Sequence, residues 1–377
     1  MTKNELFYFL GKCLSLGQSE ENKQEVIRTI YQEEVDWERF VFMASNQFVL
    51  PSVYLRFKQQ GILPYLPVEL SDHLKMVYDL NYQRNTTIMK QMNRINCLFA
   101  VVGIVPIYLK GTANMLDHLY EDLGERMVSD IDLLVSDDDF IQAANLLKGE
   151  GYEHVDLFFE DQQSATKHFP RLVHPTELVD IEVHRVPVDI DLSAHFNYDI
   201  INPEKKRIET NPPCYVLSDR HKVILNFMHG FMASDVRLMH QISFQNMVDL
   251  FFLSHRINVY EVLVQLPSYT GRALVYVDFV NYTMGFNNSH QPNFRSKLFI
   301  QKHDLFQKSK LWYHLVWVPK YLVGSMIWSG YLRNCIGVVY SRQIRKSVFR
   351  RLSTPSWYIS HIKWHSNSFK QNFRRKK

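Results

Sequence analysis

Features that mark secreted proteins and cysteine metal sites are scarce in this sequence. It has four cysteines in 377 residues, Cys13, Cys97, Cys214 and Cys335, and none of them forms a CxxC pair. That scarcity argues against a disulfide framework and a cysteine zinc site, and it favours reduced thiols. Residues 1–5 begin no apolar signal-peptide segment. We therefore expect a cytoplasmic protein.

Long uncharged runs are also missing. The least charged portion, residues 311–341, is interrupted by Lys320 and Arg333, with twelve uncharged residues between them. Such a run is too short to cross a bilayer. Hydrophobic residues nevertheless make up 46% of the chain, which predicts a folded protein with a large core rather than a disordered one.

Acidic residues are almost absent from the C-terminal region. Residues 295–377 contain eighteen lysines and arginines but only one acid, Asp304, together with five of the six tryptophans. Cations interleaved with aromatic rings suit an anionic membrane surface, so we expect peripheral attachment at the inner membrane face. Nucleic acid is a less favoured partner for the same surface. A solvated tail whose aromatic rings pack on the core is the third interpretation.

A strand-to-helix turn lies near residue 110. The β-rich run 105–109 leads to Lys110, Gly111 and Thr112. We expect Thr112 to cap a helix over residues 113–120, whose first N–H groups are free to bind an anion. The glycine allows close approach and the lysine adds a positive charge. The turn therefore predicts a phosphate-binding loop, although such a turn taken alone is more often structural.

A pair of aspartates opens the next predicted strand. Residues 129–135 alternate between polar and apolar side chains, so Asp130 and Asp132 share one face. Carboxylates at such positions lie about 6 to 7 Å apart at the backbone, close enough to share bound metal ions. The pair suits Mg²⁺. The three aspartates at 137–139 are interpreted instead as the cap and first turn of the helix that follows.

A third carboxylate comes from a later strand. In residues 177–184 the alternation places Asp180, Glu182 and His184 on one face. Carboxylates from two strands that face a helix N-terminus are typical of two-metal phosphoryl or nucleotidyl transfer. The sequence therefore predicts a metal site made by Glu182 and the two aspartates.

Other polar residues have weaker claims to the site. His184 shares the carboxylate face and is a candidate to orient a substrate or relay a proton. His168, His174 and His229 fit ordinary polar roles near a cleft equally well. Arg126 either steadies the two aspartates, reaches a phosphate or lies on the surface.

These residues resemble the nucleotidyltransferases of the DNA polymerase beta superfamily. They are more closely similar to a bacterial family of uncharacterised nucleotidyltransferases with an LKG loop, an arginine, a DID strand and a later IEVH-type strand. Here these are Leu109-Lys110-Gly111, Arg126, Asp130-Ile131-Asp132 and Ile181-Glu182-Val183-His184. The resemblance covers roughly residues 35–255. The chain departs from the superfamily's usual Gly-Gly or Gly-Ser loop, because a threonine follows the glycine and a lysine precedes it.

The resemblance implies an α+β fold, with a polymerase beta-like core built on a small mixed sheet and flanked by helical regions. We expect an N-terminal helical domain over residues 1–97 and the catalytic core over residues 98–202. A helical subdomain over residues 203–294 and the basic region over residues 295–377 would follow. The apolar spacing on both sides of the acidic strands agrees with helical flanks.

The resemblance also implies a reaction. An NMP group would pass from an NTP, ATP by default, to an acceptor hydroxyl, and pyrophosphate would leave. Two Mg²⁺ ions would be held by Asp130, Asp132 and Glu182, with Glu182, or secondarily His184, assisting deprotonation of the acceptor. The residues expected to bind the nucleotide are Lys110, Gly111, Thr112 and Arg126.

The acceptor is left open by the sequence, as a glycan, a peptide, a protein or a small metabolite. Two other functions compete. The same residues could transfer the terminal phosphoryl group, as in a kinase. Alternatively, the chain could bind a nucleotide with little chemistry and act as a scaffold at the membrane surface.

Overall fold

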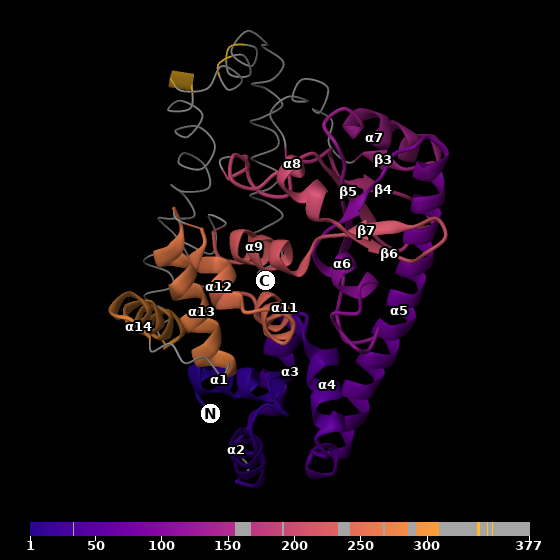
Figure 1. The fold of residues 1–377 in the computed structure, drawn as a ribbon. Helices are drawn as coiled ribbons and strands as arrows, with labels where there is room; N and C mark the ends of the chain where they lie inside the picture. The colour runs from indigo at the N-terminus through magenta and orange to yellow at the C-terminus, as the bar shows by residue number, and fades with distance from the viewer. Residues whose placement is uncertain are drawn as a thin grey trace. The chain divides into compact units, whose positions relative to one another are not determined.

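The computed structural model describes residues 1–32, 34–154, 167–190, 192–232, 242–266, 268–285 and 292–308, and also Val338, Val339, Arg345 and Phe349 (Figure 1). The described residues up to Lys308 belong to one compact unit. Most of the basic region expected at 295–377 lies outside the described residues, so its attachment to a membrane stays a prediction. Among the helices that are described, none has the length and apolarity needed to cross a bilayer.

Helices open the chain, as predicted. They are α1 (Lys3–Leu14), α2 (Glu20–Tyr31), α3 (Trp37–Asn46), α4 (Leu50–Gln59), the short 3-10 helix η1 (Leu63–Tyr65) and the long α5 (Val68–Val101). Side chains of Thr2, Ser19 and Asp36 accept hydrogen bonds from backbone N–H groups at the starts of α1, α2 and α3. These capping bonds satisfy backbone donors that a helix start otherwise leaves free.

The strands form one mixed sheet. They are β1 (Ile107–Tyr108), β2 (Asp130–Leu134), β3 (Glu153–His154), β4 (Leu172–Val173), β5 (Asp180–His184), β6 (Lys206–Ile208) and β7 (Cys214–Val216). Their order across the described sheet is β3-β4-β5-β2-β1-β7-β6. The central strand β2 pairs antiparallel with β1 and parallel with β5. The predicted α+β class with a mixed sheet is therefore confirmed.

Helix α5 runs along the sheet and holds two of its strands (Figure 1). The hydroxyl of Tyr108 in β1 donates to the Met92 carbonyl at 3.0 Å, and Gln91 Nε2 donates to the Val179 carbonyl just before β5 at 2.9 Å. Nearer the N-terminus of the same helix, Asn85 Nδ2 donates to the Arg126 carbonyl at 2.7 Å. The buried amides of α5 thus fix the backbone next to β5 and ahead of β2.

Shorter elements follow or connect the strands. They are α6 (Lys110–Leu116), α7 (Phe140–Gly149), α8 (Tyr198–Ile201) and the 3-10 helix η3 (Asn202–Glu204). Helix α7 begins at Phe140, as predicted, but the three aspartates lie ahead of it rather than in its first turn, and the side chain of the N-cap residue Asp139 makes no capping hydrogen bond. The helix contacts both α5 and β5.

The helix after the glycine turn differs from the prediction. It begins at Lys110 rather than Ala113, so Thr112 lies inside its first turn and donates its hydroxyl to the Leu109 carbonyl at 2.8 Å instead of capping an N–H group. It ends at Leu116, because His118 adopts a left-handed φ of 55°. The predicted cap and the extension to residue 120 were wrong. A non-glycine residue ends the helix where the sequence rule looks for glycine.

The later helices are α9 (Asp219–Gly230), α11 (Phe244–Ser254), α12 (Val259–Val264), α13 (Thr270–Met284) and α14 (Phe294–Lys308). Helix α13 contacts α1, α12 and α14. The ring of Phe7 in α1 lies 4.6 Å from that of Phe244 in α11, centroid to centroid. The first helix and the later helices therefore share one apolar core, and the four-part domain division stays a prediction.

Candidate active site

The parallel pairing of β2 with β5 builds an acidic face. The register sets Asp130 opposite Asp180 and Asp132 opposite Glu182. The intervening side chains are fully buried: Ile131, Leu133, Ile181 and Val183. Because a slip of one residue would expose this whole apolar set, the buried face fixes the register and holds the carboxylates side by side on the other face.

The side chains of Asp132, Glu182 and His184 lie close together. His184 Nε2 lies 2.8 Å from Asp132 Oδ1 and 3.4 Å from Glu182 Oε2. One donor atom from each residue falls within a group whose members lie no more than 4.8 Å apart. Asp130 lies outside this group, and its Oδ1 accepts the Ser129 hydroxyl at 2.7 Å. The group offers two carboxylates and an imidazole, a donor set that fits a divalent cation.

Positive side chains cover the carboxylates. Lys110 Nζ lies 2.6 Å from Asp132 Oδ1, and Arg171 Nη2 lies 2.9 Å from Glu182 Oε1 and 3.6 Å from Asp130 Oδ2. Arg171 was not identified from the sequence, because no periodicity or motif links it to the acidic strands. These two cations neutralise part of the negative charge that the strands bring together.

The pKa values of the carboxyl groups reflect these contacts. Burial alone would raise the pKa of Asp132, but Lys110 and His184 outweigh burial and hold it at about 2. For Glu182 burial is again opposed, by His184, His168 and Arg171, and its pKa lies well below the ordinary value. Burial and the neighbouring Asp132 raise the pKa of Asp130. The buried Asp132 and Glu182 therefore stay ionised at neutral pH.

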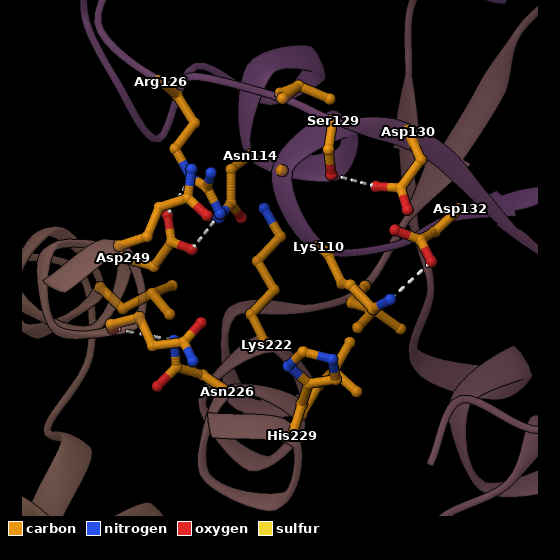
Figure 2. Close-up of a pocket in the computed structure, with 17 residues that line it drawn as sticks. Lys110, Asn114, Arg126, Ser129, Asp130, Asp132, Lys222, Asn226, His229 and Asp249 are labelled. Atoms are coloured by element: carbon orange, nitrogen blue, oxygen red, sulfur yellow. Dashed lines mark hydrogen bonds and ion pairs between the residues drawn. The ribbon is translucent and has the colours of Figure 1, made fainter. Parts of the chain in front are cut away.

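Next to this face lies a cavity of about 220 Å³, here called the polar cavity (Figure 2). In Figure 2, Asp130 and Asp132 lie on one side, the Arg126–Asp249 pair lies on the other, and Lys222 extends between them. The residues that line it are Lys110, Gly111, Asn114, Arg126, Val128, Ser129, Asp130, Asp132, Leu217, Lys222, Leu225, Asn226, His229, Gln245, Asn246, Asp249 and Leu253. The predicted loop, strand β2 and helices α9 and α11 thus share one pocket.

Gly111 and Lys110 shape the turn that borders the cavity. A Cβ at Gly111 would come within 3.0 Å of Val128 Cγ2, so the turn packs tightly against the segment before β2. Lys110 adopts φ 50°, an uncommon conformation for a residue with a side chain. Backbone strain of this kind costs on the order of 1–3 kcal/mol and persists only where surrounding contacts impose it.

One interpretation of the sequence expected Arg126 to steady the two aspartates of β2. In the structure its guanidinium group pairs with Asp249 instead. Its Nε donates to Asp249 Oδ1 at 2.9 Å and its Nη2 to Asp249 Oδ2 at 2.8 Å, so the ion pair is bidentate and buried. The hydroxyl of Tyr120 donates to the same Oδ1 at 2.6 Å. Arg126 therefore links the segment before β2 to α11 while it lines the polar cavity.

Two cavity residues from α9 add to the predicted set. Lys222 is buried and pairs with Asp117, which Arg256 also contacts at 3.2 Å. Burial lowers the pKa of Lys222 against the opposing effect of Asp117. Desolvation, with a contribution from Lys110, lowers the pKa of His229, so His229 is neutral at pH 7 and lines the cavity as a hydrogen-bonding group.

The two remaining candidate histidines, His168 and His174, have different neighbours. The ring of His168 lies 5.1 Å from that of His184, centroid to centroid, and its Nδ1 is 2.7 Å from the Phe169 carbonyl oxygen. Burial, then His184, lowers the pKa of His168. The ring of His174 instead lies 4.9 Å from that of Tyr152, centroid to centroid, and its Nδ1 accepts the Thr176 N–H at 3.2 Å. His168 thus borders the acidic face, whereas the contacts of His174 lie elsewhere.

Replacing Arg171 with glutamine is expected to tighten divalent-metal binding about threefold to tenfold, because the arginine competes for Glu182 and Asp130. The effect is modest because the Arg171 side chain is 50% exposed and water screens its charge. Calorimetric titration with Mg²⁺ measures it. Arg94→Gln is the matched control, since Arg94 is 56% exposed and pairs with Glu177, away from the acidic face. Unchanged affinity in Arg171→Gln would show that Arg171 does not compete with metal.

Comparison with known proteins agrees with the geometry. The family model described as "Uncharacterised nucleotidyltransferase" matches residues 33–261, which include the whole sheet and every residue of the polar cavity. No curated protein and no solved structure matches the chain. Because the match spans more than half of the sequence, the chain belongs to this family of uncharacterised nucleotidyltransferases.

Proposed function

We propose that the protein transfers an NMP group from an NTP, with ATP as the default donor, to an acceptor hydroxyl and releases pyrophosphate. The observation that carries this proposal is the β2–β5 register, which sets Asp132 beside Glu182 and Asp130 beside Asp180, while Asp130 and Asp132 also line the polar cavity. Membership of a nucleotidyltransferase family supports it. The acceptor hydroxyl belongs to a glycan, a peptide, a protein or a small metabolite.

Divalent metal is part of the proposal. The donors on the acidic face are carboxylate oxygens, which Mg²⁺ prefers. Lys110 and Arg171 form ion pairs with these carboxylates, so the face attracts cations. Asp130, Asp132 and Glu182 would hold Mg²⁺, which would neutralise charge on the triphosphate and orient it for in-line attack.

Residues of the polar cavity would bind the nucleotide. Lys110 and Lys222 bring positive charge to its wall, and Gly111, which lines the same wall, lets the turn pack against Val128 because it has no side chain. The bidentate Arg126–Asp249 pair keeps the wall in place while part of Arg126 faces the cavity. Thr112 is nearly fully buried and bonded to the backbone, so its proposed part is to stabilise the turn.

Glu182 is the proposed acceptor of the proton from the attacking hydroxyl. It stays ionised because His184 and Arg171 hold its carboxylate. His184 is fully buried and has no open edge for an acceptor, which favours Glu182 for this role. In this proposal His184 contacts the carboxylates of Asp132 and Glu182 and does not touch the acceptor.

Incubation with Mg²⁺ and each NTP, labelled in turn at the α- or the γ-phosphate, tests the function. We expect metal-dependent binding of at least one NTP, and pyrophosphate release with the α-label passing to an acceptor or, slowly, to water. Release of an NDP would instead indicate phosphoryl transfer, and binding without turnover would favour a scaffold. Absence of binding by all four NTPs would overturn the proposal.

A further inference from the structure

We propose that His184 is itself a metal ligand, so that one of the two metal positions is built from an imidazole nitrogen and two carboxylate oxygens. The other two ligands are Asp132 and Glu182. This inference rests on the proposed metal dependence of the site. It requires no bound nucleotide and can be tested separately from catalysis.

The distances fit a single ion. Neighbouring ligand atoms of an octahedral ion with bonds of about 2.1 Å lie about 3.0 Å apart. His184 Nε2 is 2.8 Å from Asp132 Oδ1 and 3.4 Å from Glu182 Oε2, on either side of that value. The group as a whole spans at most 4.8 Å. Side-chain adjustment would bring all three atoms onto one ion, around which ligand atoms lie at most about 4.2 Å apart.

The fold keeps the imidazole in this position. His184 follows Glu182 by two residues on the same face of β5, so the strand period aims both side chains the same way. The ring is fully buried, and Nδ1 has no hydrogen-bond partner within the described ranges. Nε2 faces the carboxylates and lies within hydrogen-bond distance of Asp132 Oδ1, so an ion bound between them would take the place of the proton on that nitrogen and leave the remaining imidazole proton on Nδ1.

An imidazole ligand changes which metal the position prefers. Mg²⁺ favours oxygen ligands, whereas a neutral imidazole nitrogen is a good ligand for first-row transition ions. We therefore assign the position formed by Asp132, Glu182 and His184 to a transition ion such as Mn²⁺ or Co²⁺. The oxygen-only position, formed by Asp130 with the shared Asp132, suits Mg²⁺.

Electron spin-echo spectroscopy of the full chain loaded with Mn²⁺ tests the assignment. We expect modulation from one directly bound ¹⁴N, replaced by a ¹⁵N pattern when the protein is grown with ¹⁵N-histidine. This comparison needs no variant and is unaffected by folding defects. Mn²⁺ bound without nitrogen coupling overturns the inference and leaves the proposed function intact. Failure to bind either Mn²⁺ or Mg²⁺ overturns both.

Variants identify the histidine. His184→Gln is expected to lose the nitrogen modulation and to weaken Mn²⁺ binding about tenfold to a hundredfold, with a smaller effect on Mg²⁺. His168→Gln is the matched control, because its ring lies 5.1 Å from that of His184 and it borders the same face. It should keep the modulation. Modulation that persisted in folded His184→Gln would overturn the assignment.

Discussion

Asp132→Asn is expected to lower pyrophosphate release by about 10³-fold or more, or roughly 4 kcal/mol of activation free energy. Asp132 is 2% exposed, contacts both Lys110 and His184, and lies beside Glu182 in the register. Asparagine keeps the shape of the side chain and removes the charge that would bind metal. The measurement is the steady-state rate with the NTP that binds most tightly.

The fold should survive this substitution. Lys110 is 22% exposed and can turn its ammonium group toward water when its partner is neutral. Asp137→Asn is the matched control, because Asp137 follows the same strand, is 66% exposed and pairs with Arg185 at the surface. Circular dichroism and thermal unfolding check both variants. If Asp132→Asn turned over at more than a tenth of the native rate, the site assignment would be wrong.

The largest loss of stability is expected from Asp249→Ala. Its partner Arg126 is 9% exposed, so the substitution leaves a buried guanidinium without a counterion and Tyr120 without its acceptor. Breaking such a pair costs about 3 to 5 kcal/mol. Urea denaturation measures the free energy of unfolding directly.

Glu177→Gln provides the contrast for that measurement. It breaks the Arg94 pair, whose arginine is 56% exposed, and the expected cost is less than about 1 kcal/mol. A double variant, Arg126→Met with Asp249→Leu, should recover part of the stability because it leaves no unpaired buried charge. Equal losses from Asp249→Ala and Glu177→Gln would contradict the importance given to burial.

The acidic face illustrates what local patterns reveal. The alternation in residues 129–135 and 177–184 predicted two strands and the side of each that carries acids, and both strands formed as β2 and β5. Their direct pairing with each other was not predicted, since periodicity does not specify a strand's neighbour. The two-residue and three-residue strands of this sheet are too short to produce a readable alternation.

Errors arose where partners are distant or the backbone is unusual. Arg126 pairs with Asp249, which lies 123 positions later, and no local pattern connects them. Arg171 reaches the carboxylates from a segment without regular spacing. The bounds of α6 were wrong because Lys110 and His118, both non-glycine, adopt positive φ. Propensity rules reserve that conformation for glycine and asparagine.

The β2–β5 pairing also links assembly of the metal site to folding. Asp132 and His184 are 52 positions apart in the chain, so their meeting requires a long loop to close before its contacts can compensate for the lost entropy. The segment that closes the loop contains α7 and the strands β3 and β4. A folding intermediate that has joined β1 to β2 but has not docked β5 would lack the cluster of ligands. Metal capture during refolding would therefore report the completion of this parallel pairing.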